Sequence, residues 1–244
     1  MKYLGSKNLI AKDLAPVIQR YINKDTTFYI EPFVGGTNMI DKIEFDRKVG
    51  SDINPYLIAL LQYAQNIDNL LPESISEGEY NAVKTNRSAY DEWYVGLVGF
   101  CATFSAKFFG GYARGFKNDG VTPRDIPAES IRNLSKQRQN LAGISFASKS
   151  FSDYNDVKGA VIYCDPPYRD TTKYKTDAFD YDAFYDWCVK MSEHNTVLIS
   201  EYNMPSDRFD VVWEKEHSVN LDAKRGAKST RIERLYTVRK DEQR

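Results

Sequence analysis

The stretch Val161–Tyr168, with the sequence VIYCDPPY, decides how the fold of this chain is interpreted. Three of its first four residues are branched or aromatic, which is typical of a central strand in a sheet covered on both faces. The Pro166-Pro167 pair removes two backbone donors and disfavours a helix, so the strand ends at Asp165. An acid, two rigid backbone units and an aromatic ring thus follow a strand, at the edge where open α/β sheets bind ligands. An ordinary proline-rich turn is the alternative.

Most of the chain alternates between helical and strand patterns. Apolar residues at helical spacing predict helices over residues 8–22, 55–64, 131–141 and 181–192, and a further helix is expected to begin near Met39. Short apolar runs bounded by turn signals predict strands at residues 28–31, 48–52, 144–148, 160–164 and 196–200. Residues 210–213 and 234–238 are expected to pair as an antiparallel hairpin at the sheet edge. This alternation predicts an α/β fold.

Composition argues against several classes of protein. The three cysteines are few and odd in number and form no C-x-x-C pair, which argues against a disulfide framework and for a reducing, intracellular location. Because the chain has only two histidines, we expect no metal site. No run is apolar enough for a signal core or a bilayer span, so we expect a cytoplasmic protein with no membrane partner. A net charge of −1 leaves any attraction to nucleic acid to local patches.

Residues 66–143 have no clear strand pattern and interleave aromatic with basic residues. From Lys107 to Arg138, seven basic residues stand against three acids, a local balance of +4. Lysine and arginine can contact DNA phosphates, and aromatic rings can stack or wedge beside a displaced base. The alternative is a solvated charged insertion with a small core of its own. The candidate DNA contacts in this segment are Lys107, Tyr112, Arg114, Lys117 and Arg124.

A second strand-end motif is Glu31–Gly36 (EPFVGG), where two glycines let the backbone bend tightly and a ligand approach closely. Asp52 follows Glu31 by 52 − 31 = 21 residues, at the end of the next predicted strand. This is about the spacing at which an acid receives ribose hydroxyls in nucleotide-binding βαβ units. The alternative is a plain glycine turn with a solvent-facing aspartate. No G-x-x-x-x-G-K-[ST] motif is present, which argues against a phosphate-cradling ATPase loop.

Together these motifs resemble those of the Dam-like adenine-N6 DNA methyltransferases, of the amino-type class alpha. Tyr3–Lys7 (YLGSK) resembles the first, lysine-ending motif of that family, and Glu31–Gly36 resembles its cofactor loop. Ser51–Asn54 (SDIN) resembles the adenosyl ribose motif and Asp165–Tyr168 (DPPY) the catalytic motif. The resemblance continues through residues 198–201 and covers most of residues 1–65 and 144–240. Thr37 departs from it, because many relatives continue the glycine run there.

The resemblance implies a Rossmann-like S-adenosylmethionine-dependent methyltransferase sheet with a mostly helical inserted target-recognition domain. Residues 1–65 and 144–244 would form the catalytic, cofactor-binding domain, and residues 66–143 the inserted DNA target-recognition domain. The implied partner is double-stranded DNA, methylated at a specific site, with GATC as the family expectation, by a monomer or weak dimer. The implied cofactor is S-adenosylmethionine, without a metal, and its expected contacts are Tyr3, Lys7, Glu31, Pro32, Phe33, Gly35, Gly36, Asp52, Ile53 and Asp165.

The chemistry of adenine gives the DPPY residues their expected catalytic roles. The exocyclic amine is a poor nucleophile, because its lone pair is delocalised into the ring. Asp165 and the carbonyl of Pro166 could each accept one of its hydrogen bonds and draw the nitrogen toward tetrahedral geometry for in-line attack on a sulfonium methyl. Pro167 would help hold that carbonyl still, and Tyr168 would stack on a base that has been flipped out of the duplex.

Other assignments remain open. The chain could be a related amino methyltransferase that acts on cytosine N4, RNA adenine or a protein glutamine. It could also be a catalytically silent homologue that binds DNA without methylating it. Cys164 could suggest cytosine-C5 chemistry, but a cysteine that ends a buried strand is expected to be a core residue. Lys7 could instead be a surface charge and Tyr3 a helix-packing residue. In the loop expected before the last strand, which also holds Arg231, further candidate DNA contacts are Lys224, Arg225 and Lys228.

Overall fold

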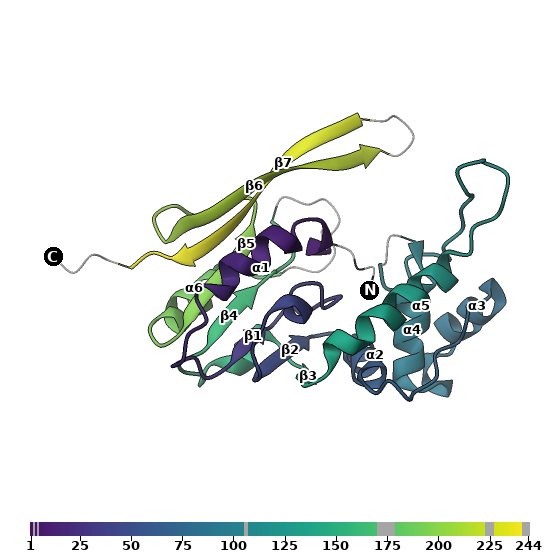
Figure 1. Cartoon of the computed structure of the whole chain (residues 1–244), viewed down its shortest axis with the longest axis horizontal. Helices are drawn as coiled ribbons and strands as arrows, with labels where there is room; N and C mark the ends of the chain where they lie inside the picture. The colour runs from purple at the N-terminus through teal and green to yellow at the C-terminus, as the bar shows by residue number, and fades with distance from the viewer. Residues whose placement is uncertain (2, 4, 105–106, 170–178, 223–226, 241–244) are drawn as a thin grey trace. The chain divides into compact units, whose positions relative to one another are not determined.

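The computed structural model describes residues 1, 3, 5–104, 107–169, 179–222 and 227–240, apart from the side chains of residues 217–222 and 227–230 (Figure 1). Within these residues seven strands form a mixed sheet, which confirms the α/β, Rossmann-like class. The strands are β1 (Tyr29–Glu31), β2 (Lys48–Asp52), β3 (Ile144–Ser148), β4 (Val161–Cys164), β5 (Thr196–Glu201), β6 (Phe209–Asp222) and β7 (Ala227–Val238). The chain divides into two compact units, Met1–Pro16 with Val34–Ser150 and Val17–Phe33 with Phe151–Arg244.

In the second unit the strand order is β1-β4-β5-β7-β6. The first three strands run parallel, with Val161 of β4 opposite Tyr29 on one side and Thr196 on the other. β7 and β6 continue the sheet in antiparallel orientation. β4 is buried at every residue, as expected for a strand covered on both faces. Because parallel strands end at the same edge, the residues that follow β1, β4 and β5 gather in one place.

Helix α6 (Tyr181–Ser192) packs on β5 in this unit and has the predicted bounds. Asp180 caps the helix, since its carboxylate accepts a hydrogen bond from the Ala183 amide at 2.9 Å. The buried face of the helix carries large apolar side chains, among them Phe184 and Trp187. These side chains cover the sheet beside the DPPY segment and keep the neighbouring strands dry.

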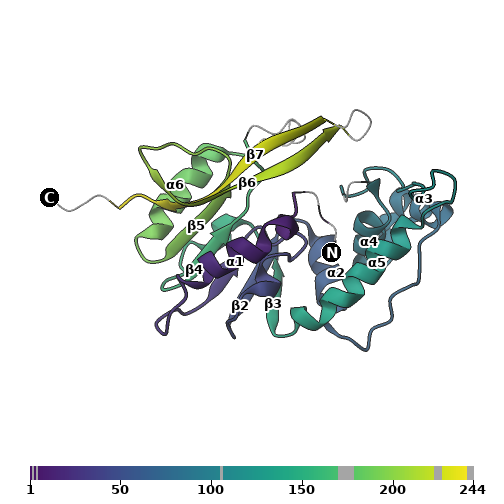
Figure 2. The ribbon, with the colours of Figure 1, turned by 45° about the horizontal axis from the view of Figure 1, so that its top comes forward.

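β6 and β7 form a long hairpin that is prominent in both views of the ribbon (Figures 1 and 2). The prediction that residues 210–213 and 234–238 pair is confirmed, but both strands extend well beyond those bounds. Arg231 pairs with His217 and Lys228 with Asn220, so both residues belong to β7 and not to the loop expected there. Two β-branched residues, Thr230 and Ile232, flank Arg231 and favour strand over loop, which the charge-based interpretation underestimated.

In the first unit β2 pairs in parallel with β3, from Lys48 opposite Ile144 to Asp52 opposite Ser148. Helix α2 (Pro55–Gln65) follows β2 at once, because the Asn54 side chain accepts hydrogen bonds from the first amides of the helix. Helix α4 (Glu92–Cys101) crosses α2 closely: a Cβ atom at Gly96 would lie 2.1 Å from the carbonyl oxygen of Tyr56. A glycine is therefore required at that crossing.

Residues 66–143 lie in the first unit, and helices are their main regular elements, which agrees with the predicted helical character. Their helices are α3 (Glu77–Thr85), α4 and α5 (Ile126–Gln137), with short 3-10 turns at Arg87–Ala89 (η3) and Arg138–Leu141 (η5). α5 begins at Ile126 rather than Ile131, because Asp125 accepts the Ala128 amide at 2.9 Å and Pro127 suits a first turn. The role of this segment as a DNA target-recognition domain stays a prediction.

Two predictions near the N-terminus need correction. The helix expected to begin near Met39 is wrong, since only the 3-10 turn η2 (Ile40–Lys42) forms there. The Lys48 ammonium donates to the carbonyls of Ile40 and Ile43 at 3.3 and 3.1 Å, and Ile43 is extended, so the turn cannot continue as a helix. The helix predicted over residues 8–22 is divided into the 3-10 turn η1 (Lys7–Leu9) and α1 (Ala11–Gln19). No helix of the described chain is long and apolar enough to cross a membrane.

Candidate active site

The acids that follow β1, β4 and β5 lie at the common carboxyl edge of the sheet in the second unit. Glu31 ends β1, Asp165 follows β4 and Glu201 ends β5. Glu233 comes from the antiparallel strand β7 and accepts a hydrogen bond from the hydroxyl of Tyr168. The three glutamates are almost completely buried, whereas Asp165 is partly exposed. The arrangement presents one accessible carboxylate in front of buried ones.

The two prolines form a rigid end to β4. Pro166 is buried and Pro167 half-buried, and the Tyr181 hydroxyl donates to the Pro167 carbonyl at 2.9 Å. Tyr181 is the first residue of α6, so this bond joins the motif to the helix that covers the sheet. The fixed φ angles of the prolines and this hydrogen bond leave the backbone around Asp165 little freedom.

Tyr168 is held from two sides. Its hydroxyl donates to Glu233, and its ring meets the ring of Tyr202 edge-on, with centroids 4.6 Å apart and planes at 85°. Burial raises the pKa of the hydroxyl well above its usual range, and the charges of Asp165 and Glu233 add to that shift. The hydroxyl therefore stays protonated and acts as a donor. The side chain is 8% exposed, so its orientation is set by packing.

The carboxyl group of Glu201 has a raised pKa. Its pKa is raised to about 8, first by burial and further by the charges of Asp165 and Glu233, although the amides of Tyr202 and Arg169 oppose the shift. Those two amides donate to its carboxyl oxygens at 2.7 and 3.3 Å. Glu201 is therefore mostly neutral at pH 7, which limits the negative charge that surrounds Asp165.

The first residues of the predicted cofactor loop also lie in the second unit. The Tyr29 hydroxyl donates to Glu31 Oε1 at 2.7 Å and orients this buried carboxylate. Pro32 is buried behind it. Phe33 packs in a cluster of aromatic rings at centroid distances of 5.6 to 5.9 Å, and the other rings are Phe151, Phe179 and Phe184. The backbone after β1 is thus fixed by ring packing on one side and by the oriented acid on the other.

In the first unit the loop continues as a tight glycine turn. The Val34 amide donates to the Ser51 carbonyl at 2.8 Å, and the Thr37 amide donates back to the Val34 carbonyl at 2.9 Å. Gly35 has a φ of +46°, and a Cβ atom there would lie 2.8 Å from the Tyr3 ring. A Cβ atom at Gly36 would lie 2.7 Å from Tyr3 Cβ. Both glycines are therefore needed, one for its backbone conformation and both for the close approach of Tyr3.

Asp52 lies beside this turn at the end of β2. Its carboxylate accepts the Asn54 amide at 3.0 Å, and hydrogen bonds from the Gly35 and Ile53 amides and the Tyr3 hydroxyl also stabilise its charged form. Burial nevertheless dominates and raises the pKa of Asp52 to about 6. The structure thus brings together four predicted cofactor contacts of this unit: Tyr3, Gly35, Asp52 and Ile53. The Ile53 side chain itself is 76% exposed, an apolar surface next to the acid.

Lys7 is buried, with 7% of its surface exposed, so its interpretation as a surface charge is wrong. It begins the turn η1, whose cap is Ser6, with the Ser6 hydroxyl accepting the Asn8 amide at 3.2 Å. Tyr3 packs on Phe100 with ring centroids 5.7 Å apart, in addition to its contacts with the glycine turn. Tyr3 and Lys7, the first and last residues of the lysine-ending motif, are therefore packed parts of the first unit.

The predicted DNA contacts of residues 107–124 are not equally available. Lys107 and Lys117 are exposed. Arg114 forms an ion pair with Glu77, and Arg124 forms one with Glu129. The Tyr112 hydroxyl donates to the Ile75 carbonyl at 2.8 Å and holds the segment to the chain before α3. Two of the five predicted contacts thus already have acidic partners.

Residues 115–124 form a small hairpin that sequence analysis did not predict. The Lys117 amide donates to the Thr122 carbonyl and the Arg124 amide to the Gly115 carbonyl, both at 2.9 Å. The Asp119 carboxylate closes the tip by accepting the amides of Val121 and Thr122 at 2.9 Å. Phe116 and Val121 are 62% and 76% exposed, so the hairpin presents apolar side chains among basic ones. The only signals in the sequence were Asp119-Gly120 and the neighbouring aromatic residue.

Three further candidates cannot be placed in the site. Lys224 and Arg225 lie outside the described residues, and Lys228 lies in β7 with its side chain outside the description. Arg231 stands over the ring of Tyr202, with its guanidinium carbon 5.0 Å from the centroid. Since Tyr202 in turn packs on Tyr168, Arg231 of β7 is connected through Tyr202 to the DPPY segment.

Cys164 is fully buried at the end of β4, and Cys188 of α6 is fully buried as well. The expectation that Cys164 is a core residue is confirmed. No cluster of three or more histidine, cysteine or acidic side chains suited to a metal occurs in the described part of the chain.

Comparison with known proteins gives one match to a family. The model of the D12 class N6 adenine-specific DNA methyltransferases matches residues 3–226. Among solved structures, the crystal structure of SMU.472, a proposed methyltransferase complexed with SAH, matches with 12% sequence identity and a TM-score of 0.32. The match covers 95% of this chain and 53% of that one, so the chain spans about half the length of that protein. The comparison with curated proteins found no match.

Proposed function

Since the chain belongs to the D12 class N6 adenine-specific DNA methyltransferase family, we propose that it methylates N6 of a flipped adenine at a specific site in double-stranded DNA. The cofactor of such a reaction is S-adenosylmethionine. The observation that carries the proposal is the partly exposed Asp165 at the end of β4, backed by a rigid Pro-Pro segment and by a buried, hydrogen-bonded Tyr168.

The residues present suit S-adenosylmethionine, which supplies a sulfonium-bound, electrophilic methyl group when bound. The Asp52 carboxylate suits ribose hydroxyls, because it already lies among amide donors and its charged form can accept further hydrogen bonds. The exposed Ile53 side chain offers an apolar surface for a nucleobase. The turn at Gly35 and Gly36 lets the backbone approach the ligand. We assign the remaining contacts to Tyr3, Lys7, Glu31, Pro32, Phe33 and Asp165.

Asp165 and the carbonyl of Pro166 act on the target amine. Each accepts one of the two amine hydrogens, so the nitrogen lone pair turns out of conjugation and faces the methyl carbon. When bound, S-adenosylmethionine would supply its methyl group to this nitrogen and leave as the thioether. The extra proton on nitrogen then leaves to Asp165 or to solvent. Tyr168 holds the base, and its bond to Glu233 keeps the ring in one orientation.

Glu201 supports this chemistry through its neutral state. If all four acids of the cluster were ionised, their mutual repulsion would destabilise the charged carboxylates. A protonated Glu201 removes one charge from the neighbourhood. We therefore assign Glu201 as a positioning residue that limits the negative charge beside Asp165.

The hairpin of residues 115–124 is the best candidate for contact with duplex DNA. Its exposed Lys117 can contact phosphate, and Phe116 can wedge beside the space that a flipped base leaves. Lys107 lies on the same segment and can add a phosphate contact. Arg114 and Arg124 can take part only by sharing or replacing their acidic partners, so their contribution should be smaller.

Two alternatives differ from this proposal in a measurable way. A catalytically silent homologue would bind DNA without transferring a methyl group, and a related amino methyltransferase would prefer RNA or cytosine. Labelled S-adenosylmethionine is incubated with duplex DNA and with RNA of the same sequence, using wild type and Asp165→Ala. We expect label in DNA with the wild-type protein only. Equal, background-level transfer by both proteins to both substrates would contradict the proposed methyltransferase activity.

A further inference from the structure

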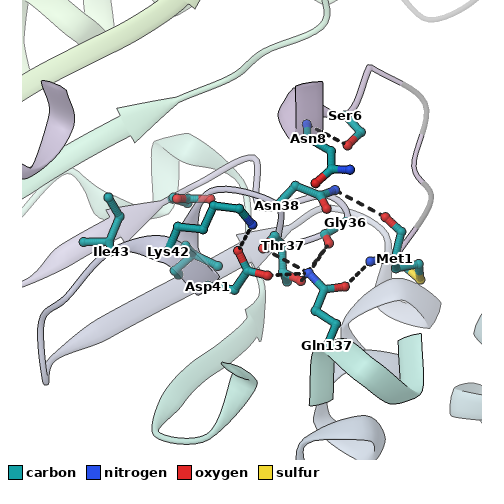
Figure 3. A network of polar contacts seen from close by, with 12 residues as sticks. Met1, Ser6, Asn8, Gly36, Thr37, Asn38, Asp41, Lys42, Ile43 and Gln137 are labelled. Carbon is teal, nitrogen blue, oxygen red and sulfur yellow. Dashed lines mark hydrogen bonds and ion pairs between the residues drawn. The ribbon is translucent and has the colours of Figure 1, made fainter. Parts of the chain in front are cut away.

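The carboxamide of Gln137, the last residue of α5, lies at the centre of a buried polar network in the first unit (Figure 3). Its Nε2 donates to Thr37 Oγ1 and to Asp41 Oδ2, both at 2.8 Å. Longer hydrogen bonds reach the carbonyls of Gly36 and Thr37 at 3.2 and 3.3 Å. Its Oε1 accepts a hydrogen bond from the Met1 amino group. One side chain from the helical segment thus contacts the glycine turn at three different oxygens.

Thr37 explains why the turn needs this support. It has a φ of +60°, a conformation that costs little for glycine and is strained for a β-branched residue. Thr37 is fully buried, and it stands where the resemblance predicts a third glycine. Its hydroxyl donates to the Gly36 carbonyl at 2.7 Å, which leaves the oxygen lone pairs to accept from Gln137. The chain of bonds from Gln137 through Thr37 to Gly36 therefore fixes the turn in its strained form.

The shape of this turn matters because Asp52 depends on it. The Gly35 amide is one of the donors that stabilise the Asp52 carboxylate. The Val34 amide donates to the carbonyl of Ser51, the residue before Asp52 in β2. If Thr37 relaxed to a negative φ, the backbone of Gly35 and Gly36 would have to rotate with it. The donor to Asp52 and the close approach of Tyr3 would both change.

We propose that Gln137 is a positioning residue for cofactor binding, which holds Thr37 in the left-handed conformation and thereby shapes the Gly35-Gly36 turn. The inference rests on the proposed role of that turn and of Asp52 in binding S-adenosylmethionine. It also assigns a second function to residues 66–143: the end of their last helix supports the cofactor turn.

The test measures the affinity for S-adenosylhomocysteine by calorimetry, together with the melting temperature without ligand, on protein with no residues added before Met1. Gln137→Ala should weaken binding about tenfold, since it leaves buried acceptors unpaired and releases the turn. The double variant Gln137→Ala with Thr37→Gly should bind within about threefold of wild type, because glycine adopts a positive φ without support. Binding by the double variant that is no better than by Gln137→Ala would overturn the inference.

Gln65→Ala is the matched control. Gln65 is also a helical glutamine of the first unit whose Nε2 donates to two carbonyls, those of Leu141 and Ile144, at 2.7 and 2.6 Å. Its loss should lower the melting temperature as Gln137→Ala does and leave the ligand affinity unchanged. Weakened binding in Gln65→Ala equal to that in Gln137→Ala would mean that general destabilisation is the cause, and would overturn the proposed role.

A second pair of variants covers the case in which Gln137→Ala does not fold. Thr37→Ser keeps the hydroxyl and should bind like wild type, whereas Thr37→Val removes it and should bind about tenfold more weakly. Equal affinity of the serine and valine variants would contradict the inference. If Asp52→Asn abolishes binding while Gln137→Ala and Thr37→Val bind normally, only this inference fails. If wild type does not bind the ligand at all, the proposed cofactor site fails with it.

Discussion

The hydroxyl of Tyr168 donates a hydrogen bond to the carboxylate of Glu233, which lies 65 residues further along the chain. This bond joins the last residue of the DPPY motif to a strand that has no part in the motif itself. The bond and the contact with Tyr202 hold the tyrosine ring in one orientation, because the ring cannot move without breaking the bond or displacing Tyr202.

Tyr168→Phe should therefore reduce kcat about tenfold, since it keeps the ring and leaves a buried carboxylate without its donor, a loss of about 1 to 3 kcal/mol. The KM for cofactor should stay unchanged. Glu233→Gln retains an acceptor oxygen and should keep most of the activity. Steady-state kinetics at saturating cofactor distinguish the two variants. Full activity in Tyr168→Phe would show that the hydroxyl bond does not orient the ring.

Stability should depend on pH through Glu201. Its pKa is about 8 in the folded protein against an ordinary value of 4.5, so between these values the folded state binds more protons than the unfolded state. Unfolding free energy must then fall as pH rises from about 4.5 to about 8. Glu201→Gln, which stays neutral, should be clearly more stable than wild type at pH 8 and gain little at pH 5. Urea unfolding at several pH values measures this difference.

The exposed Glu193, at the end of α6, provides the control for that series. Glu193→Gln should leave the pH dependence of wild type unchanged. A Glu201→Gln variant whose stability runs parallel to wild type across pH 5 to 8 would mean that Glu201 is ionised in the folded protein at neutral pH.

Cofactor affinity should depend on pH through Asp52. The carboxyl group has a pKa of about 6, raised by burial, and it must be ionised to offer both oxygens to ribose hydroxyls. Affinity for S-adenosylhomocysteine should be constant above pH 7 and fall as pH drops through about 6. Asp52→Asn should bind at least about tenfold more weakly at pH 7.5 and lose that pH dependence. Calorimetry at pH 5.5 and 7.5 is sufficient, and unaltered binding by Asp52→Asn would exclude the ribose role.

The prediction for DNA concerns Phe116 at the hairpin of residues 115–124. Phe116→Ala should raise the KM for duplex DNA about tenfold, through the loss of about 1 to 3 kcal/mol of stacking or wedging, with cofactor affinity unchanged. Leu70→Ala is the control, because Leu70 is also an exposed apolar residue of the first unit but lies away from this hairpin in the sequence. An equal KM for duplex DNA in the two variants would show that Phe116 does not contact the DNA.

The sequence alone was sufficient to predict that certain polar residues directly follow buried strands. Asp52 and Asp165 come directly after apolar runs, and the glycines and prolines beside them mark where the backbone must turn. Local patterns do not contain the partners of those residues. Glu233 reaches Tyr168 and Gln137 reaches Thr37 across 65 and 100 residues, and only the packed sheet and helices bring them into contact.

The two wrong predictions, a helix after Met39 and a loop before Arg234, have the same physical origin. The residues after Met39 have a helical pattern, but the ammonium of Lys48 binds the carbonyls of Ile40 and Ile43 and ends the turn. The residues before Arg234 carry enough charge to suggest a loop, yet cross-strand pairing with β6 extends β7 back to Ala227. In both cases a tertiary partner outweighs the local preference.

The identity of the methylated base tests the proposed adenine methylation. Duplex DNA is incubated with S-adenosylmethionine and either wild type or Asp165→Ala, then digested to nucleosides and analysed by mass spectrometry. We expect N6-methyldeoxyadenosine from wild type and at least about a thousandfold less from Asp165→Ala, since the acceptor that frees the amine lone pair is gone. Methylated cytosine as the product, or equal amounts of N6-methyldeoxyadenosine from both proteins, would contradict the proposal.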